Sequence, residues 1–98
     1  MQKIRGSERN DRLSGGARAD FLQGFDGRDA LRAGDGADRL VGGDRADTLF
    51  GGGGGDTLIG GNGRDRAEGD RGNDRVDGSG GADRLHGGGG HDTMLGGA

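Results

Sequence analysis

Residues 51–68 read GGGGGDTLI GGNGRDRAE, two consecutive nine-residue segments with one plan. Each segment opens with a glycine-rich stretch, has Asp at its sixth position (Asp56 and Asp65) and has an apolar residue at its eighth. The same frame extends in both directions and gives ten units without a gap over residues 6–95. An internal repeat of this length is typical of architectures that stack copies of one small unit, so we expect the repeat to decide the fold.

Two columns of residues define the register of the ten units. Position six is always Asp, at Asp11, Asp20, Asp29, Asp38, Asp47, Asp56, Asp65, Asp74, Asp83 and Asp92. Position eight is always apolar, at Leu13, Leu22, Leu31, Leu40, Leu49, Leu58, Ala67, Val76, Leu85 and Met94. Position one is Gly in every unit except the fourth, which has Ala33. This regularity goes beyond what a biased composition produces.

The composition excludes several classes of protein. Only 27% of the 98 residues are apolar and three are aromatic, which is too little for an ordinary globular core. The chain has 28 Gly and no Pro, so it should stay disordered unless another term offsets its ordering entropy. The absence of Cys excludes disulfides and thiolate zinc sites. We find no apolar run of membrane-spanning length, and no apolar signal-peptide core in residues 1–7.

Each unit divides into a turn and a strand. Gly in the first six positions permits positive φ and lets backbone carbonyls converge, whereas the last three positions alternate as a short strand with its apolar residue on one side. The pattern predicts an all-β parallel β-roll of about five 18-residue coils, with two units per coil and the position-eight side chains inside. We expect a lead-in over residues 1–5, one β-roll domain over residues 6–95, and the start of an eleventh unit or a tail at 96–98.

The units resemble the nonapeptide GGxGxDxUx of the RTX, or haemolysin-type, calcium-binding repeat family. The resemblance covers about nine-tenths of the chain, and ten in-phase copies make it far more specific than a single match. It implies that the turns bind Ca²⁺ between adjacent coils through the Asp side chain and turn carbonyls. It also implies a part of a secreted bacterial toxin, protease, lipase or adhesin, exported by a type I system.

Stacking the units also creates an electrostatic problem. Residues 18 apart would lie one above another, so Asp56 would sit between Asp38 and Asp74 in a column of carboxylates that repel one another. Ca²⁺ accepts six to eight oxygen ligands and fits such turns better than Mg²⁺ or Zn²⁺. We therefore predict all ten position-six Asp residues as metal ligands, with at most about eight internal Ca²⁺ sites.

The predicted sites are not equal. Three turns match the family pattern fully, whereas the first, second and fifth units carry Arg9, Arg18 and Arg45 at position four. Arg at that position is expected to strain the turn and to add a competing cation. The best sites should therefore lie in the second half, pairing Asp56 with Asp74, Asp74 with Asp92, and Asp65 with Asp83.

Residues outside the two columns support fewer predictions. Arg recurs at position seven, but the net charge is −3 and the chain has no Tyr or Trp, so we expect a solvated face and no nucleic-acid partner. Val41, Phe50 and Ile59 at position nine are either a small docking patch or ordinary strand residues. Met94 and Leu95 would end the stack exposed, which favours a fragment, an engineered piece or end-to-end self-association.

The sequence therefore predicts a Ca²⁺-dependent folding module of a secreted, extracellular protein. The alternative is a repeat-built adhesin or interaction surface in which calcium is only structural. We predict no enzyme activity, since the acidic residues at position six are accounted for by the repeat and no catalytic motif is present.

Overall fold

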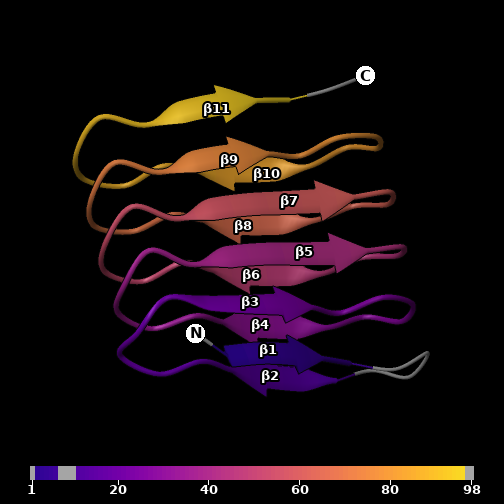
Figure 1. The fold of residues 1–98 in the computed structure, drawn as a ribbon. Helices are drawn as coiled ribbons and strands as arrows, with labels where there is room; N and C mark the ends of the chain where they lie inside the picture. Colours follow the sequence, from indigo (N-terminus) through magenta and orange to yellow (C-terminus); the bar gives the residue numbers. More distant parts are fainter. Residues whose placement is uncertain (1, 7–10, 97–98) are drawn as a thin grey trace.

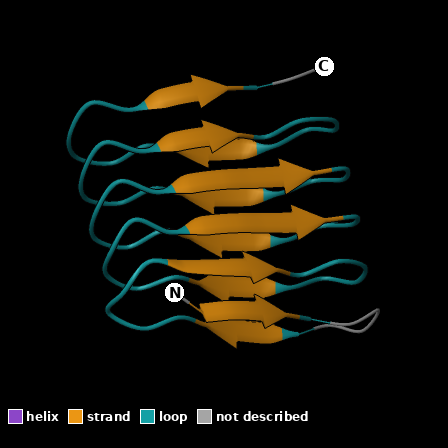
Figure 2. Ribbon diagram, viewed as in Figure 1, coloured by secondary structure: helices purple, strands orange, loops and turns teal. Residues whose placement is uncertain are grey.

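The computed structural model describes residues 2–6 and 11–96. Within these residues every regular element is a short strand, and turns connect the strands (Figure 2). The strands are β1 (Gln2–Arg5), β2 (Arg12–Ser14), β3 (Asp20–Gln23), β4 (Ala30–Arg32), β5 (Arg39–Gly43), β6 (Thr48–Phe50), β7 (Thr57–Gly61), β8 (Arg66–Glu68), β9 (Arg75–Asp77), β10 (Arg84–His86) and β11 (Thr93–Leu95). The described part of the chain contains no helix that could cross a membrane.

The strands form two parallel sheets that face each other. One sheet has the order β1-β3-β5-β7-β9-β11 and the other has β10-β8-β6-β4-β2, so successive strands alternate between sheets (Figure 1). Each strand pairs with the strand 18 residues away, as Leu40 pairs with Leu58. This register confirms the predicted parallel β-roll, with two nine-residue units per coil and about five coils.

The core is a thin double ladder of position-eight side chains. The fully buried members are Leu22, Leu31, Leu40, Leu49, Leu58, Ala67 and Val76. The molecule is a slab of 29 × 28 × 13 Å, thin across the two sheets. Leu85 is only partly buried, and Met94 and Leu95 are 51% and 42% exposed, so the C-terminal coil ends exposed as predicted.

The first strand was not predicted from the repeat. β1 lies in the lead-in segment and pairs with β3, with Ile4 beside Leu22. Ile4 lies nine residues before Leu13, in phase with the apolar column, although no glycine-rich turn precedes it. That phase was the signal from which the strand could have been predicted.

Of the two alternatives for the position-nine residues, a single docking patch of all three is excluded by their positions. Val41 and Ile59 are paired neighbours on β5 and β7. Phe50 lies on β6 in the opposite sheet, where it pairs with Arg32 and Glu68. Consecutive units face opposite sides of the roll, so only alternate units share an outer surface.

Candidate functional site

The ten position-six Asp residues occupy the two edges of the roll, where each turn enters a strand. Even-numbered units place theirs on one edge and odd-numbered units on the other, because successive strands alternate between sheets. Seven of these residues are at most 3% exposed, namely Asp20, Asp29, Asp38, Asp47, Asp56, Asp65 and Asp74. Asp11, Asp83 and Asp92 are partly buried. Buried carboxylates on this scale require partners.

One oxygen of each carboxylate links adjacent coils. The backbone N–H of Asp38 donates to Oδ1 of Asp56 at 2.8 Å, and the N–H of Asp56 donates to Oδ1 of Asp74 at 2.8 Å. The same bond recurs eight times along the two edges, from the Asp11–Asp29 pair to the Asp74–Asp92 pair. The predicted Asp columns are therefore present, and each of the eight residues from Asp29 to Asp92 is hydrogen-bonded to the Asp 18 positions earlier.

The second oxygen is left without a hydrogen-bond donor. Oδ2 is buried and unpartnered in Asp29, Asp38, Asp47, Asp56, Asp65, Asp74 and Asp83. A buried carboxylate oxygen with no donor is costly, and seven in one small fold form a pattern rather than an accident of packing. The recurring orphan atom is what a bound cation would satisfy.

Backbone oxygens converge beside this orphan atom. A Cβ placed on Gly51 would lie 2.5 Å from Oδ2 of Asp56 and 2.9 Å from the carbonyl oxygen of Gly69 in the next coil. Farther along the turns, a Cβ on Gly63 would lie 2.6 Å from the carbonyl oxygen of Arg45. Glycine at position one keeps a Cβ out of the place where carboxylate and carbonyl oxygens meet, and the fourth unit is the exception, with a buried Ala33 there.

Most of the turns contain two residues whose backbone is in the left-handed conformation. In eight of the nine fully described turns, positions two and four both have positive φ, as Gly52 (85°) and Gly54 (91°) do. Phe25, Arg45, Asp70 and Ser79 adopt this conformation without being glycine. The expected strain at Arg45 is confirmed by its φ of 75°. Arg9 lies outside the described residues.

The turn at residues 15–20 is the exception. Neither Gly16 nor Arg18 has a left-handed φ. The N–H of Gly16 instead donates to Oδ2 of Asp20 at 2.8 Å. Here Arg at position four goes with a different turn, in which the chain's own backbone binds the second carboxylate oxygen.

Burial perturbs the acidity of the columns. Desolvation, reinforced by neighbouring carboxylates in the column, raises the pKa of Asp47 and of Asp56 to about 8, and desolvation raises that of Asp65 to about 7. The pKa values of Asp29, Asp38 and Asp74 are raised for the same leading reason. The hydrogen bond from the preceding coil's backbone opposes this shift. At neutral pH the carboxyl groups of Asp47 and Asp56 therefore favour either a proton or a cation.

The donor set fits a hard cation. No three His, Cys, Asp or Glu side chains converge on a point within residues 2–6 and 11–96. A bound ion would therefore take oxygens from at most two Asp side chains together with backbone carbonyls. An all-oxygen, mixed set of this kind suits Ca²⁺, whereas Zn²⁺ prefers imidazole or thiolate.

The comparisons with known proteins agree with the repeat. The family model of the RTX calcium-binding nonapeptide repeat, which spans four copies, matches residues 5–40, 32–67 and 68–98. Neither the curated proteins nor the solved structures give a match. The family matches together extend over nearly the whole sequence. The chain belongs to the RTX calcium-binding nonapeptide repeat family.

Proposed function

We propose that this chain is a calcium-driven folding module in which Ca²⁺ ions bind between successive coils. The proposed ligands are the position-six carboxylates and the turn carbonyls that face them. The carboxylates are Asp11, Asp20, Asp29, Asp38, Asp47, Asp56, Asp65, Asp74, Asp83 and Asp92. The observation that carries the proposal is the buried, donorless Oδ2 that recurs in seven of these residues. Calcium binding by members of the family supports it.

The energetic argument concerns what opposes folding without the ion. A chain with 28 Gly among 98 residues loses much conformational entropy on folding, and its core is one thin ladder. Stacking then buries columns of mutually repelling carboxylates. Ca²⁺ would supply the positive charge and the missing partner for Oδ2, so its binding free energy becomes folding free energy.

Sites of unequal strength are part of the proposal. Five turns per edge leave four gaps, which gives at most about eight internal ions. We propose that the strongest pair Asp56 with Asp74, Asp74 with Asp92, and Asp65 with Asp83. Most of the turns involved have Gly at both left-handed positions, which avoids the backbone strain that Arg45 carries.

The setting proposed for the module is extracellular. RTX repeats are typical of secreted proteins. A chain that stays unfolded at low Ca²⁺ and folds at the millimolar Ca²⁺ outside cells suits type I export as part of a larger protein. A fused enzyme, toxin or adhesin domain would then carry any further activity, and we propose no catalytic role for this chain.

A second candidate function is an interaction surface for which calcium is only structural. The observation that favours it is the row of exposed arginines on the outer faces of both sheets. In this case Ca²⁺ would fold the roll, and the faces would bind a partner.

The test is a titration of CaCl₂ into metal-free protein, followed by far-UV circular dichroism, with MgCl₂ at matched ionic strength. We expect a cooperative change from coil to β structure with Ca²⁺ alone. Asp74→Ala should raise the midpoint at least about tenfold, because one column loses a ligand shared by two gaps. Asp35→Ala, an exposed carboxylate on the same edge, is the matched control and should shift it by less than about twofold.

Two outcomes would contradict the proposal. A spectrum rich in β structure in chelator at pH 8.5, above the raised pKa values of Asp47 and Asp56, would mean that the apolar ladder folds unaided. Equal effects of Asp35→Ala and Asp74→Ala would mean that overall negative charge, rather than a specific oxygen, responds to calcium.

A further inference from the structure

Acidic residues lie mainly in the turns, and more than half of the basic residues lie on the outer faces of the two sheets. By their place in the repeat, 15 of the 17 acidic residues lie in the turns, and only Glu68 and Asp77 lie at outward strand positions. Eight of the 14 basic residues lie at outward strand positions, namely Lys3, Arg5, Arg12, Arg32, Arg39, Arg66, Arg75 and Arg84. The broad faces therefore carry a net charge of +6 and the turns −9.

The basic residues on the faces are accessible. All eight are exposed, whereas most position-six carboxylates are buried at the edges. Within the described residues the one ion pair is Arg66 with Glu68, at 3.5 Å between Nη2 and Oε1, and the Arg66 side chain remains 59% exposed. Arg32 lies 5.4 Å from the ring centre of Phe50, a contact that leaves guanidinium N–H groups for another acceptor.

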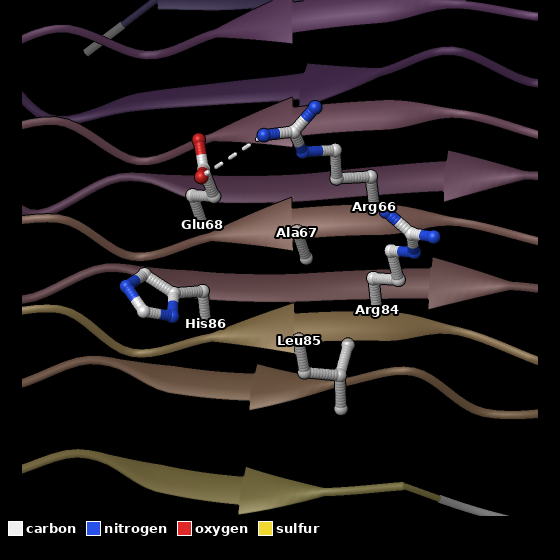
Figure 3. Close-up of a pocket in the computed structure, with 6 residues that line it drawn as sticks. All are labelled: Arg66, Ala67, Glu68, Arg84, Leu85 and His86. Atoms are coloured by element: carbon white, nitrogen blue, oxygen red, sulfur yellow. Dashed lines mark hydrogen bonds and ion pairs between the residues drawn. The ribbon is translucent and has the colours of Figure 1, made fainter.

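A shallow groove on one face illustrates the arrangement. Arg66 on β8 and Arg84 on β10 are paired neighbours, and His86 lies beside Glu68 at the other end of the same two strands (Figure 3). In the close-up, the arginine side chains lie along the outer surface on one side of the groove. Guanidinium groups on adjacent strands present planar donor pairs, which suit oxyanions that accept two hydrogen bonds at once.

Bound calcium would change the net charge of the edges relative to that of the faces. Each ion adds two positive charges at the edges, so five ions would more than cancel the −9 of the turns. We infer that the calcium-loaded roll is a basic slab whose arginine-bearing faces bind a linear sulfated polysaccharide. This inference rests on the proposed calcium binding, because the calcium-free chain is net acidic at −3.

The shape of the molecule favours this partner over other polyanions. Basic residues occur on both broad faces, and a flexible chain can contact both, whereas a flat bilayer touches one at a time. Single-stranded nucleic acid would call for exposed aromatic platforms on the faces, but Phe21 and Phe50 lie against Arg39 and Arg32, and the exposed Phe25 lies in a turn. A flat sheet also offers no projecting element to enter the major groove of a duplex.

The test measures binding of the calcium-loaded protein to immobilised dextran sulfate, with uncharged dextran as the reference surface. Binding should weaken as NaCl is raised and should be lost in chelator. The face variant Arg66→Gln/Arg84→Gln should bind about tenfold more weakly. The turn variant Arg64→Gln/Arg71→Gln removes the same charge from exposed turn residues and should change the affinity by less than about twofold.

Several results would overturn the inference. They are equal losses in the face and turn variants, undiminished binding in chelator, or equally tight binding of duplex DNA or of anionic phospholipid vesicles. Circular dichroism of the same samples separates the two proposals. Calcium-induced folding without binding to dextran sulfate removes only this inference. A lack of calcium-induced folding removes the proposed function, and it removes this inference as well whether or not the polymer binds.

Discussion

The turns at residues 15–20 and 51–56 lie two coils apart on the same edge, and each ends in the Asp of position six. The second carboxylate oxygen of that Asp has a different environment in each turn. In the later turn, Gly52 and Gly54 are left-handed and Oδ2 of Asp56 is buried without a donor. In the earlier turn, the Gly16 N–H satisfies Oδ2 of Asp20. An Asp at position six therefore does not always leave its second oxygen without a donor, because the path of the turn decides whether the backbone binds that oxygen.

Arg18 does not explain the difference alone. Arg45 occupies the same position in its unit but keeps the left-handed conformation, between Gly27 in the coil before and Gly63 in the coil after. Stacking on both sides therefore holds the open turn in place even where the residue disfavours it. The turn at 15–20 is the first glycine-rich turn on its edge and has such a neighbour only on one side.

The largest expected effect comes from removing the donorless oxygen. Asp56→Asn retains an oxygen that can accept the Asp38 N–H but replaces Oδ2 with an amide. Isothermal titration with CaCl₂ should show at least about tenfold weaker binding and the loss of at least one ion. Asp20→Asn should cost less than about threefold, because the Gly16 N–H already binds that oxygen. Equal losses at the two positions would remove the distinction between the turns.

The next effect concerns the space beside the carboxylate. Gly51→Ala places a methyl group 2.5 Å from Oδ2 of Asp56, so the coil must shift. We expect the calcium-loaded protein to lose about 1–3 kcal/mol of stability in urea denaturation. Gly16→Ala is the matched control, since a Cβ there meets nothing within 4 Å. Ala lowers the entropy of the unfolded chain, so Gly16→Ala should be neutral or slightly stabilising, and an equal cost at both positions would show that crowding beside Asp56 is not responsible.

A third expected effect is that the stability of the metal-free roll depends on pH. The raised pKa values of Asp47 and Asp56, about 8, mean that the folded chain binds more protons than the unfolded chain. Protons therefore stabilise the metal-free roll most below the unfolded pKa near 3.8, and this stabilisation is lost as the pH rises through about 8. Circular dichroism in chelator should show more β structure at pH 5 than at pH 8.5. A rise in β content with pH would contradict the sign.

The smallest expected effect comes from Arg18→Gly. If the Arg18 side chain keeps the turn at 15–20 out of the left-handed conformation, the substitution should let the turn adopt that conformation. Oδ2 of Asp20 would then lose the Gly16 N–H and become available to a cation. Calcium stoichiometry would rise by one, and the folding midpoint would fall by up to about twofold. An unchanged stoichiometry would show that the missing neighbour coil, rather than Arg18, sets the turn.

The period of the repeat predicted most of the fold and part of the site. Asp every nine residues, with Leu two positions later, fixes two sheets, an inward ladder and two columns of acids, and all of these are present. The hydrogen-bond partners of the two carboxylate oxygens could not be predicted, because they depend on the backbone conformation of each turn. The sequence favours a turn conformation but does not determine it. Arg18 and Arg45 share a position in the unit and differ in conformation.

Two other differences between the sequence-based predictions and the structure have simple causes. Ile4 continues the apolar phase in a segment without glycine, so a search for whole units passes over it. Phe50 was grouped with Val41 and Ile59 by position within the unit, but odd and even units face opposite ways.

The ladder of Asp N–H groups makes the roll a directional polymer. Each coil's Asp N–H is accepted by a carboxylate from the coil that follows it in sequence, as Asp56 accepts from Asp38. A cut that removes later coils leaves Asp N–H groups of the new last coil without acceptors, whereas a cut that removes earlier coils leaves Oδ1 atoms of the new first coil without donors. Because the two cuts expose different groups, an N–H or a carboxylate oxygen, truncations of equal length from the two ends should differ in their effect on the free energy of unfolding.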